Sequence, residues 1–211
     1  MNSSVRSRWA EALGKGAVEP DGALRPDIVD GVVAALALAQ RESLAVRITS
    51  SPGGDASGEG DAVLLSLGRL ISVDLRPAEL VVSAQAGASL AELGRTLANA
   101  GMAVLGLATI AGPEHVGSAV ASGRIPRGSL CGITVAPLTG GIVRVGGVLK
   151  DVVGYDLCGL YLGSAGSLGA IVAVDFRLIP AGFVGDGGQL PGLRTLDSLA
   201  ATLANTPPRS L

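Results

Sequence analysis

The sequence predicts an α+β protein built from two lobes. Its first half alternates helical and strand-like apolar patterns, whereas its second half consists mostly of short runs typical of antiparallel strands. The chain has 211 residues, 48% of them hydrophobic, which is enough for a buried core. Only 2% of the residues are aromatic, so we expect this core to be packed from Ala, Val, Leu and Ile.

The first half is expected to contain two helices and three strands. Pro26 opens the first helix, in which apolar residues recur at helical spacing from Ile28 to Leu38. Ser89 caps the second helix, Leu90 to Ala100, and Glu92 completes a capping box. The three strands are expected at residues 44–48, 62–67 and 79–84.

The second half is expected to hold a hairpin, a short helix and a long strand. The hairpin pairs residues 133–136 with 142–145, the helix runs from Asp156 to Leu162, and the strand covers Ile171 to Ile179. A glycine-rich linker follows, and residues 195–204 show a weak helical pattern.

Composition and charge exclude several classes of protein. The formal net charge is -2, with no basic stripe and few aromatic residues, so nucleic acid is not expected as a partner. The two cysteines, Cys131 and Cys158, lack the spacing of a metal site, and they suggest a reduced, cytoplasmic setting. The N-terminus lacks the apolar core of a signal peptide. The uncharged stretch 96–113 is broken by glycines and polar residues, so we expect no transmembrane segment.

A loop of small residues, Thr49–Gly54, follows the strand expected at 44–48. Small side chains leave backbone N–H groups accessible, and a concave run of such groups can bind a diphosphate without any lysine. From this loop alone, however, a surface turn is the stronger interpretation.

Three glycines, Gly163, Gly166 and Gly169, superficially suggest a dinucleotide-binding fingerprint. A Rossmann loop follows a strand and opens a helix. Here the helical piece comes first and the strand second, so we reject that fold. The glycines still indicate close backbone packing, against another strand or a ligand.

The sequence contains no recognisable set of catalytic side chains. His115 is the only histidine, and with Glu114 alone beside it there is neither a triad nor a metal-ligand set. No Cys/His cluster has zinc spacing, and no nucleophile elbow stands out. We therefore expect no catalytic residue and no metal. A chain without its own acid–base groups is suited to hold a cofactor that performs the chemistry.

The run from Gly146 to Ile171 resembles a family signature. Lys-x-Val-x-Gly-Tyr-Asp-Leu begins at Lys150, and Gly-Ser-x-Gly-x-Leu-Gly begins at Gly163. This pattern is similar to the FAD-binding domain of the vanillyl-alcohol oxidase / p-cresol methylhydroxylase (PCMH) type. With the upstream stretches 47–51 and 77–87, it resembles in particular the FAD-binding subunit of bacterial glycolate oxidase.

The resemblance implies a two-lobed fold that holds an extended FAD non-covalently. By position, the pyrophosphate would be wrapped by the backbone amides of Ser50, Ser51, Pro52, Gly53 and Gly54. The flavin side would be followed by Gly117, Ser118, Gly123 and Arg127. The adenosine end would be bordered by Gly166, Gly169 and Ile171.

The resemblance also implies a domain plan. Residues 1–25 would be an N-terminal extension, 26–115 the first FAD-binding lobe and 116–180 the second. Residues 181–211 would be a linker and the start of a truncated cap domain, so the cap that completes a substrate pocket is expected to be largely absent.

The implied function is that of an FAD-binding subunit in a flavin-dependent 2-hydroxy-acid oxidoreductase of the glycolate type. Its partners would be a larger flavoprotein dehydrogenase subunit and an electron-transfer subunit. The alternative is a cofactor-free, shortened paralogue that acts as an assembly subunit, because the family's paired glycines are Gly117-Ser118 here, the stretch before Arg127 is shortened and Gly128 stands where the family has an aspartate. A fragment of a longer reading frame is a third possibility.

Overall fold

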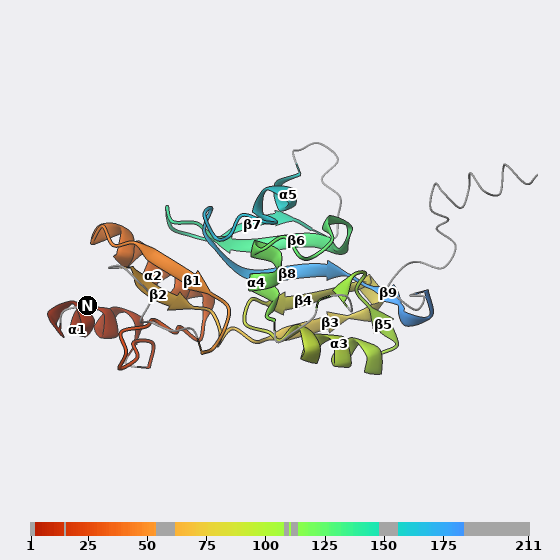
Figure 1. Cartoon of the computed structure of the whole chain (residues 1–211), viewed down its shortest axis with the longest axis horizontal. Coiled ribbons are helices and arrows are strands. Elements are labelled where there is room, and N and C mark those ends of the chain that lie inside the picture. Colours follow the sequence, from red (N-terminus) through yellow and green to blue (C-terminus); the bar gives the residue numbers. More distant parts are fainter. Residues whose placement is uncertain are drawn as a thin grey trace, which may run out of the picture.

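A computed structural model of the chain describes residues 3–14, 16–53, 62–107, 110, 114–147 and 156–183. Its largest element is a five-stranded antiparallel sheet with strand order β3-β4-β8-β6-β7 (Figure 1). The strand β8, which comes last in sequence among these five, lies at the centre. The strands are β3 (Val73–Arg76), β4 (Val81–Gln85), β6 (Leu130–Ala136), β7 (Val143–Gly146) and β8 (Ala170–Arg177).

A smaller unit packs at one end of this sheet (Figure 1). It consists of two helices, α1 (Ser3–Leu13) and α2 (Val29–Arg41), and of two parallel strands, β1 (Val46–Thr49) and β2 (Val63–Ser66). The helix α2 turns its buried small and branched residues inward because they recur every three to four positions. We call these four elements the N-terminal unit.

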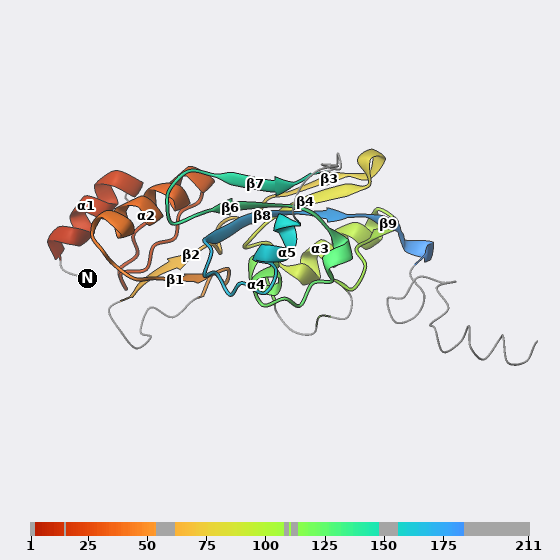
Figure 2. The same cartoon turned by 90° about the horizontal axis from the view of Figure 1, so that it is seen from above.

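Three further helices lie on one side of the large sheet (Figure 2). They are α3 (Leu90–Asn99), α4 (Val116–Ala121) and α5 (Leu157–Tyr161). Beyond the sheet, β5 (Met102–Ala103) pairs antiparallel with β9 (Ile179–Pro180). Segments of 3-10 helix that lie wholly within the described residues include η1 (Pro77–Glu79), η3 (Arg127–Ser129) and η4 (Ala181–Phe183).

Two hydrophobic clusters fill the interior. The helix-side cluster lies between the large sheet and α3, α4 and α5, and includes Leu93, Val120 and Phe176. The N-terminal cluster lies between the N-terminal unit and the sheet, and includes Trp9 and Leu36. Both clusters take residues from β8, so this strand joins the two parts of the core.

An irregularity in β8 allows it to serve both clusters. Ile171 and Val174 are three residues apart, yet both belong to the helix-side cluster, whereas Val172 belongs to the N-terminal cluster. Alternate residues of a regular strand share a face, so one extra residue is needed between them. The pairing with β6 shifts register between Thr134 and Val135, and such a β-bulge supplies that residue.

Most elements predicted from the pattern of apolar residues are confirmed. The hairpin is β6–β7 and the helix after Asp156 is α5. Ser89 caps α3 as predicted, since the N–H of Glu92 donates to Ser89 Oγ at 3.4 Å. The helices α1 and α4 and the strands β3 and β5 were not predicted. The predictions for Gly54, for the motif 150–155 and for residues 184–211 lie outside the described residues.

The strand pairing links parts of the chain that the domain plan separates. The strand β4, within the predicted first lobe, pairs with β8 of the predicted second lobe. Trp9 and Leu24, within the predicted extension, are both buried in the N-terminal cluster. The boundaries at 25, 115 and 180 stay a prediction.

None of the helices within the described residues is long and apolar enough to cross a membrane.

We predict that Trp9→Ala lowers the free energy of unfolding by about 3–5 kcal/mol, because it empties a fully buried site. Trp9 has no exposed surface, and its Nε1 donates to Glu42 Oε2 at 3.1 Å. Urea denaturation followed by circular dichroism measures the change. Leu160→Ala is the control, since Leu160 is 56% exposed and should change stability by less than about 0.5 kcal/mol. Equal effects of the two substitutions would contradict the docking of α1.

Candidate functional site

A small hollow lies where the N-terminal unit meets the large sheet. Its volume is about 110 Å³, below the roughly 300–1,000 Å³ of a pocket that encloses a whole drug-sized ligand. The end of β1, the residue after β2, the helix α4 and the turn before β8 all converge on it. Among the residues that the structure describes, its lining residues carry no charge and are Ile48, Thr49, Ser50, Leu67, Gly117, Ser118, Ala121, Ala165, Gly166, Gly169 and Ile171. We call it the seam hollow.

The loop after β1 is held in place by hydroxyl groups. Its backbone bonds to neighbouring side chains: the N–H of Ser51 donates to Thr49 Oγ1 at 3.2 Å, and Ser66 Oγ donates to the carbonyl of Ser51 at 2.8 Å. A Cβ at Gly68 would overlap the backbone of Pro52, so only glycine lets β2 turn beneath this loop. Ser50 is buried and lines the hollow, whereas Ser51, Pro52 and Gly53 do not line it.

The helix α4 enters the site against the end of β4. The N–H groups of Val116 and Gly117 donate to the carbonyls of Ala88 and Ala86, at 3.0 and 2.8 Å. A Cβ at Gly117 would overlap Ser50 Oγ and lie 2.8 Å from Ala86 Cβ. No side chain fits there, so a glycine is required for α4 to approach the Ser50 loop.

The turn before β8 is tied to α4 by two backbone hydrogen bonds. The N–H of Gly163 donates to the carbonyl of Val120 at 3.0 Å, and the N–H of Ala165 donates to the carbonyl of Ala121 at 2.8 Å. Gly169 has a φ of +128°, and a Cβ on it would lie 2.6 Å from the carbonyl oxygen of Ala136. Of the three glycines, Gly169 therefore serves close backbone packing, whereas Gly163 and Gly166 have positive φ angles of +79° and +78° in the turn.

Three lining residues carry backbone donors suited to an anion. Among the described residues, no acceptor is found for the N–H groups of Ser50, Ser118 and Gly166. These donors come from three different stretches of the chain. The described lining residues include no carboxylate, and they fit a diphosphate group, which accepts hydrogen bonds from backbone N–H groups.

Two of the predicted site residues lie away from the seam hollow. Gly123, with a φ of +74°, ends α4 and faces Gly163. Arg127 lies in η3, and its guanidinium is bonded within the chain. Its Nε donates to Asp156 Oδ2 at 2.7 Å, and its Nη1 donates to the carbonyl of Leu130 at 2.9 Å. The predicted cofactor contacts of Gly123 and Arg127 stay predictions.

The Arg127–Asp156 pair connects η3 to α5. Asp156 also caps α5, since its Oδ1 accepts the N–H of Gly159 at 3.1 Å. The hydrogen bond from Arg127 holds the pKa of Asp156 below its ordinary value, and the same bond raises the pKa of Arg127. Burial raises the pKa of the Cys158 thiol in the first turn of α5, and this cysteine packs in the helix-side cluster.

A comparison with protein families decides the identity of the fold. The FAD binding domain family matches residues 20–146, which is more than half of the chain. The chain belongs to this family. This membership confirms the family that the motifs predicted. It also confirms the predicted cofactor, FAD.

The similar proteins are larger than this chain. The glycolate oxidase subunit GlcD of Bacillus subtilis (strain 168) is 27% identical over 177 residues, which make up 76% of this chain and 37% of GlcD. An alkyldihydroxyacetonephosphate synthase structure superposes with a TM-score of 0.59 at 17% identity, and covers 74% of this chain and 31% of its own. Wild-type Phl p 4.0202, a glucose dehydrogenase, superposes with a TM-score of 0.61 at 18% identity, with 84% and 40% covered. These similarities confirm the predicted PCMH-type fold, and the chain spans less than half the length of each relative.

Six of the residues predicted to contact the cofactor line the hollow, and their contacts with FAD stay a prediction: Ser50, Gly117, Ser118, Gly166, Gly169 and Ile171. The residues it missed are small or aliphatic, such as Ala121 and Ala165. Ala165 has a φ of +51°, a conformation that its sequence neighbours, Ser164 and Gly166, favour in a tight turn. The turn that these neighbours indicate was the one sequence feature that could have pointed to Ala165 as a lining residue.

We predict that Gly117→Ala destabilises the fold by about 1–3 kcal/mol, because the added methyl group overfills the contact with Ser50 and Ala86. Gly128→Ala is the matched control, since a Cβ there meets no atom within 4 Å. Urea denaturation of both variants measures the difference. The close approach at Gly117 would be refuted if both substitutions left stability unchanged.

We also predict a pH-dependent effect of Asp156→Asn, which keeps a capping oxygen but removes the charge. The side chains of Arg127 and Asp156 are 41% and 54% exposed, so the loss at neutral pH should be about 0.2–1 kcal/mol. Because the folded pKa of Asp156 is lowered, its ionised form stabilises the fold above the unfolded pKa, and this contribution is lost as the pH falls through the folded pKa.

The difference in unfolding free energy between the wild type and Asp156→Asn should therefore shrink as the pH falls below the ordinary pKa of 3.8. Denaturation curves at neutral and acid pH test this. A difference that stays constant into the acid range would show that the ion pair does not contribute.

Proposed function

We propose that the chain is the FAD-binding part of a flavin-dependent oxidoreductase that acts on a 2-hydroxy acid of the glycolate type. The observation that carries this proposal is the convergence of Ser50, Ser118 and Gly166, with their backbone donors, on one uncharged hollow. The similarity to a glycolate oxidase subunit supports the substrate class.

Each group of lining residues would have a distinct task. The N–H groups of Ser50, Ser118 and Gly166 would hold the diphosphate, while Gly117 and Gly169 allow the backbone segments to come close enough to do so. Apolar side chains such as Ile171 would exclude water from one side of the phosphates. When bound, FAD supplies the acceptor for the hydride that leaves the hydroxyl-bearing carbon of the substrate.

The group that takes the hydroxyl proton would lie outside the seam hollow, whose described lining residues include no acid or base. We propose that a larger flavoprotein dehydrogenase subunit and an electron-transfer subunit complete the enzyme, in the cytoplasm. The description of GlcD as a subunit supports a multi-subunit enzyme.

The absorbance spectrum of the purified chain, before and after incubation with FAD and gel filtration, tests the proposal. We expect stoichiometric flavin bands, and release of all flavin into the supernatant on acid precipitation. No uptake of FAD would contradict the proposal and would favour the cofactor-free assembly subunit. Flavin that remains in the precipitate would contradict non-covalent binding alone.

We predict that Ser118→Asp weakens FAD binding by about tenfold or more, because a carboxylate in the lining repels the diphosphate. Ser122→Asp is the control: it adds the same charge to the residue that caps the C-terminal end of α4, outside the lining. Fluorescence titration with FAD compares the two variants, and circular dichroism checks that both remain folded. Equal affinities would place the phosphates away from the seam hollow.

A further inference from the structure

Two serine hydroxyls at the seam hollow have no hydrogen-bond partner within the part of the chain that the structure describes. They belong to Ser50, in the loop after β1, and to Ser118, in the first turn of α4. Neighbouring serines are bonded within the chain. Ser66 Oγ donates to the carbonyl of Ser51 at 2.8 Å, and Ser122 Oγ donates to the carbonyl of Ala119 at 3.3 Å. The fold therefore uses the hydroxyls around the hollow but not these two.

The hydroxyl of Ser50 is buried as well as unpaired. Ser50 is only 4% exposed, and its Oγ lies against α4, where a Cβ at Gly117 would overlap it. Burial of a hydroxyl without a hydrogen bond lowers stability, and almost all buried polar groups in native proteins are paired. Since Ser50 lines the hollow, a ligand bound there would supply the missing partner.

The hydroxyl of Ser118 is also available to a ligand. A serine within a helix commonly bonds back to the carbonyl four residues earlier. For Ser118 this is the carbonyl of Glu114, which accepts the N–H of Leu90 at 3.0 Å instead. Ser118 is partly exposed and lines the hollow, so its hydroxyl can turn toward an occupant without breaking a bond of the described fold.

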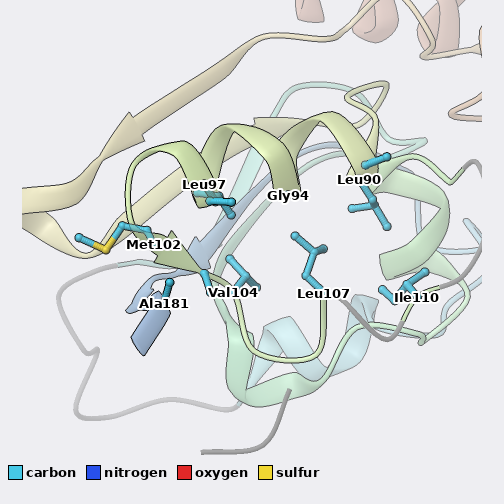
Figure 3. Close-up of a pocket in the computed structure, with 11 residues that line it drawn as sticks. Leu90, Gly94, Leu97, Met102, Val104, Leu107, Ile110 and Ala181 are labelled. Carbon is cyan, nitrogen blue, oxygen red and sulfur yellow. The ribbon is translucent and has the colours of Figure 1, made fainter. Parts of the chain in front are cut away.

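A larger cavity beside α3 has a different lining. Its volume is about 400 Å³, with Leu90 and Ile110 at one end and Met102 and Ala181 at the other (Figure 3). Its described lining consists of apolar side chains and one glycine. Of the two cavities, the seam hollow is therefore the one whose described lining offers hydroxyl groups.

A phosphate oxygen is an acceptor that fits both hydroxyls. Each can donate one hydrogen bond, and such bonds are stronger to a charged acceptor than to a neutral one. The unpaired N–H groups of Ser50, Ser118 and Gly166 belong to the same lining. Ser50 and Ser118 would thus each offer an amide and a hydroxyl donor to one diphosphate.

We propose that the side chains of Ser50 and Ser118 donate hydrogen bonds to the diphosphate, in addition to the backbone N–H groups. The inference rests on the proposed function in one respect, namely that the diphosphate of FAD occupies the seam hollow. Because the fold makes no use of the two hydroxyls, their contributions to binding and to stability can be measured separately.

Ser50→Ala and Ser118→Ala test the proposal. We expect each substitution to weaken FAD binding on the order of tenfold, because one hydrogen bond to a charged acceptor is lost. Fluorescence titration measures the affinity. Neither substitution should lower the melting temperature of the flavin-free chain, which circular dichroism measures, since no hydrogen bond within the described fold is removed.

Ser129→Ala and Ser122→Ala are the matched controls for Ser50 and Ser118. Ser129 is 2% exposed and its Oγ donates to the carbonyl of Leu105 at 2.6 Å, whereas Ser122 Oγ bonds within α4. Neither residue lines the hollow. Ser129→Ala should lower the melting temperature of the flavin-free chain, and both control variants should keep the affinity of the wild type for FAD.

Titration calorimetry with inorganic pyrophosphate separates this inference from the proposed function. If the wild type binds FAD, and Ser50→Ala and Ser118→Ala bind it equally well or more tightly, the hydroxyls are not donors and only the inference fails. A wild type that binds pyrophosphate but not FAD, with weaker pyrophosphate binding in both variants, would support the inference and contradict the proposed function. Binding of neither ligand would overturn both.

Discussion

The central strand β8 is the element on which the rest of the structure depends. It pairs with β4 on one side and with β6 on the other, and it contributes side chains to both hydrophobic clusters. A regular strand of this length would present alternate residues to the same face throughout. The bulge opposite Thr134 and Val135 interrupts that alternation, and so lets Ala170 and Val172 pack against the N-terminal unit while Ile171, Val174 and Phe176 pack beneath the helices.

The seam hollow is a consequence of this shared strand. The two clusters meet at the beginning of β8. At this place three segments lie close together: the loop after β1, the helix α4 and the turn before β8. Their approach is limited by backbone volume, which is why Gly117 and Gly169 leave no room for a side chain. The site that results offers backbone N–H groups rather than charged side chains. Such a site suits a bound cofactor that supplies the reactive group itself, and it requires no charged side chain in the lining.

The sequence could predict local structure and the family, but not the convergence of distant segments. The capping box at Ser89 and the apolar periods are local signals, and they located α2, α3 and most strands. The helix α4 escaped because Gly117 and Ser118 in its first turn are poor helix formers, and β3 escaped because it is a short edge strand. The motif glycines identified several lining residues. Alanines such as Ala121 line the hollow only through tertiary packing, which leaves no mark on the sequence around them.

The two cavities lie toward opposite ends of β8. The seam hollow borders the residues that open the strand, Gly169 and Ile171, whereas a second cavity, of about 400 Å³, lies beside α3 and beyond the end of the strand, where Ala181 follows β9. An eight-residue strand is roughly 26 Å long, so the two cavities lie about that far apart along the sheet. Both border the helix-side cluster, since Leu97 and Val104 of that cluster line the second cavity, and Val116 and Val120 of the cluster belong to α4, which lines the seam hollow.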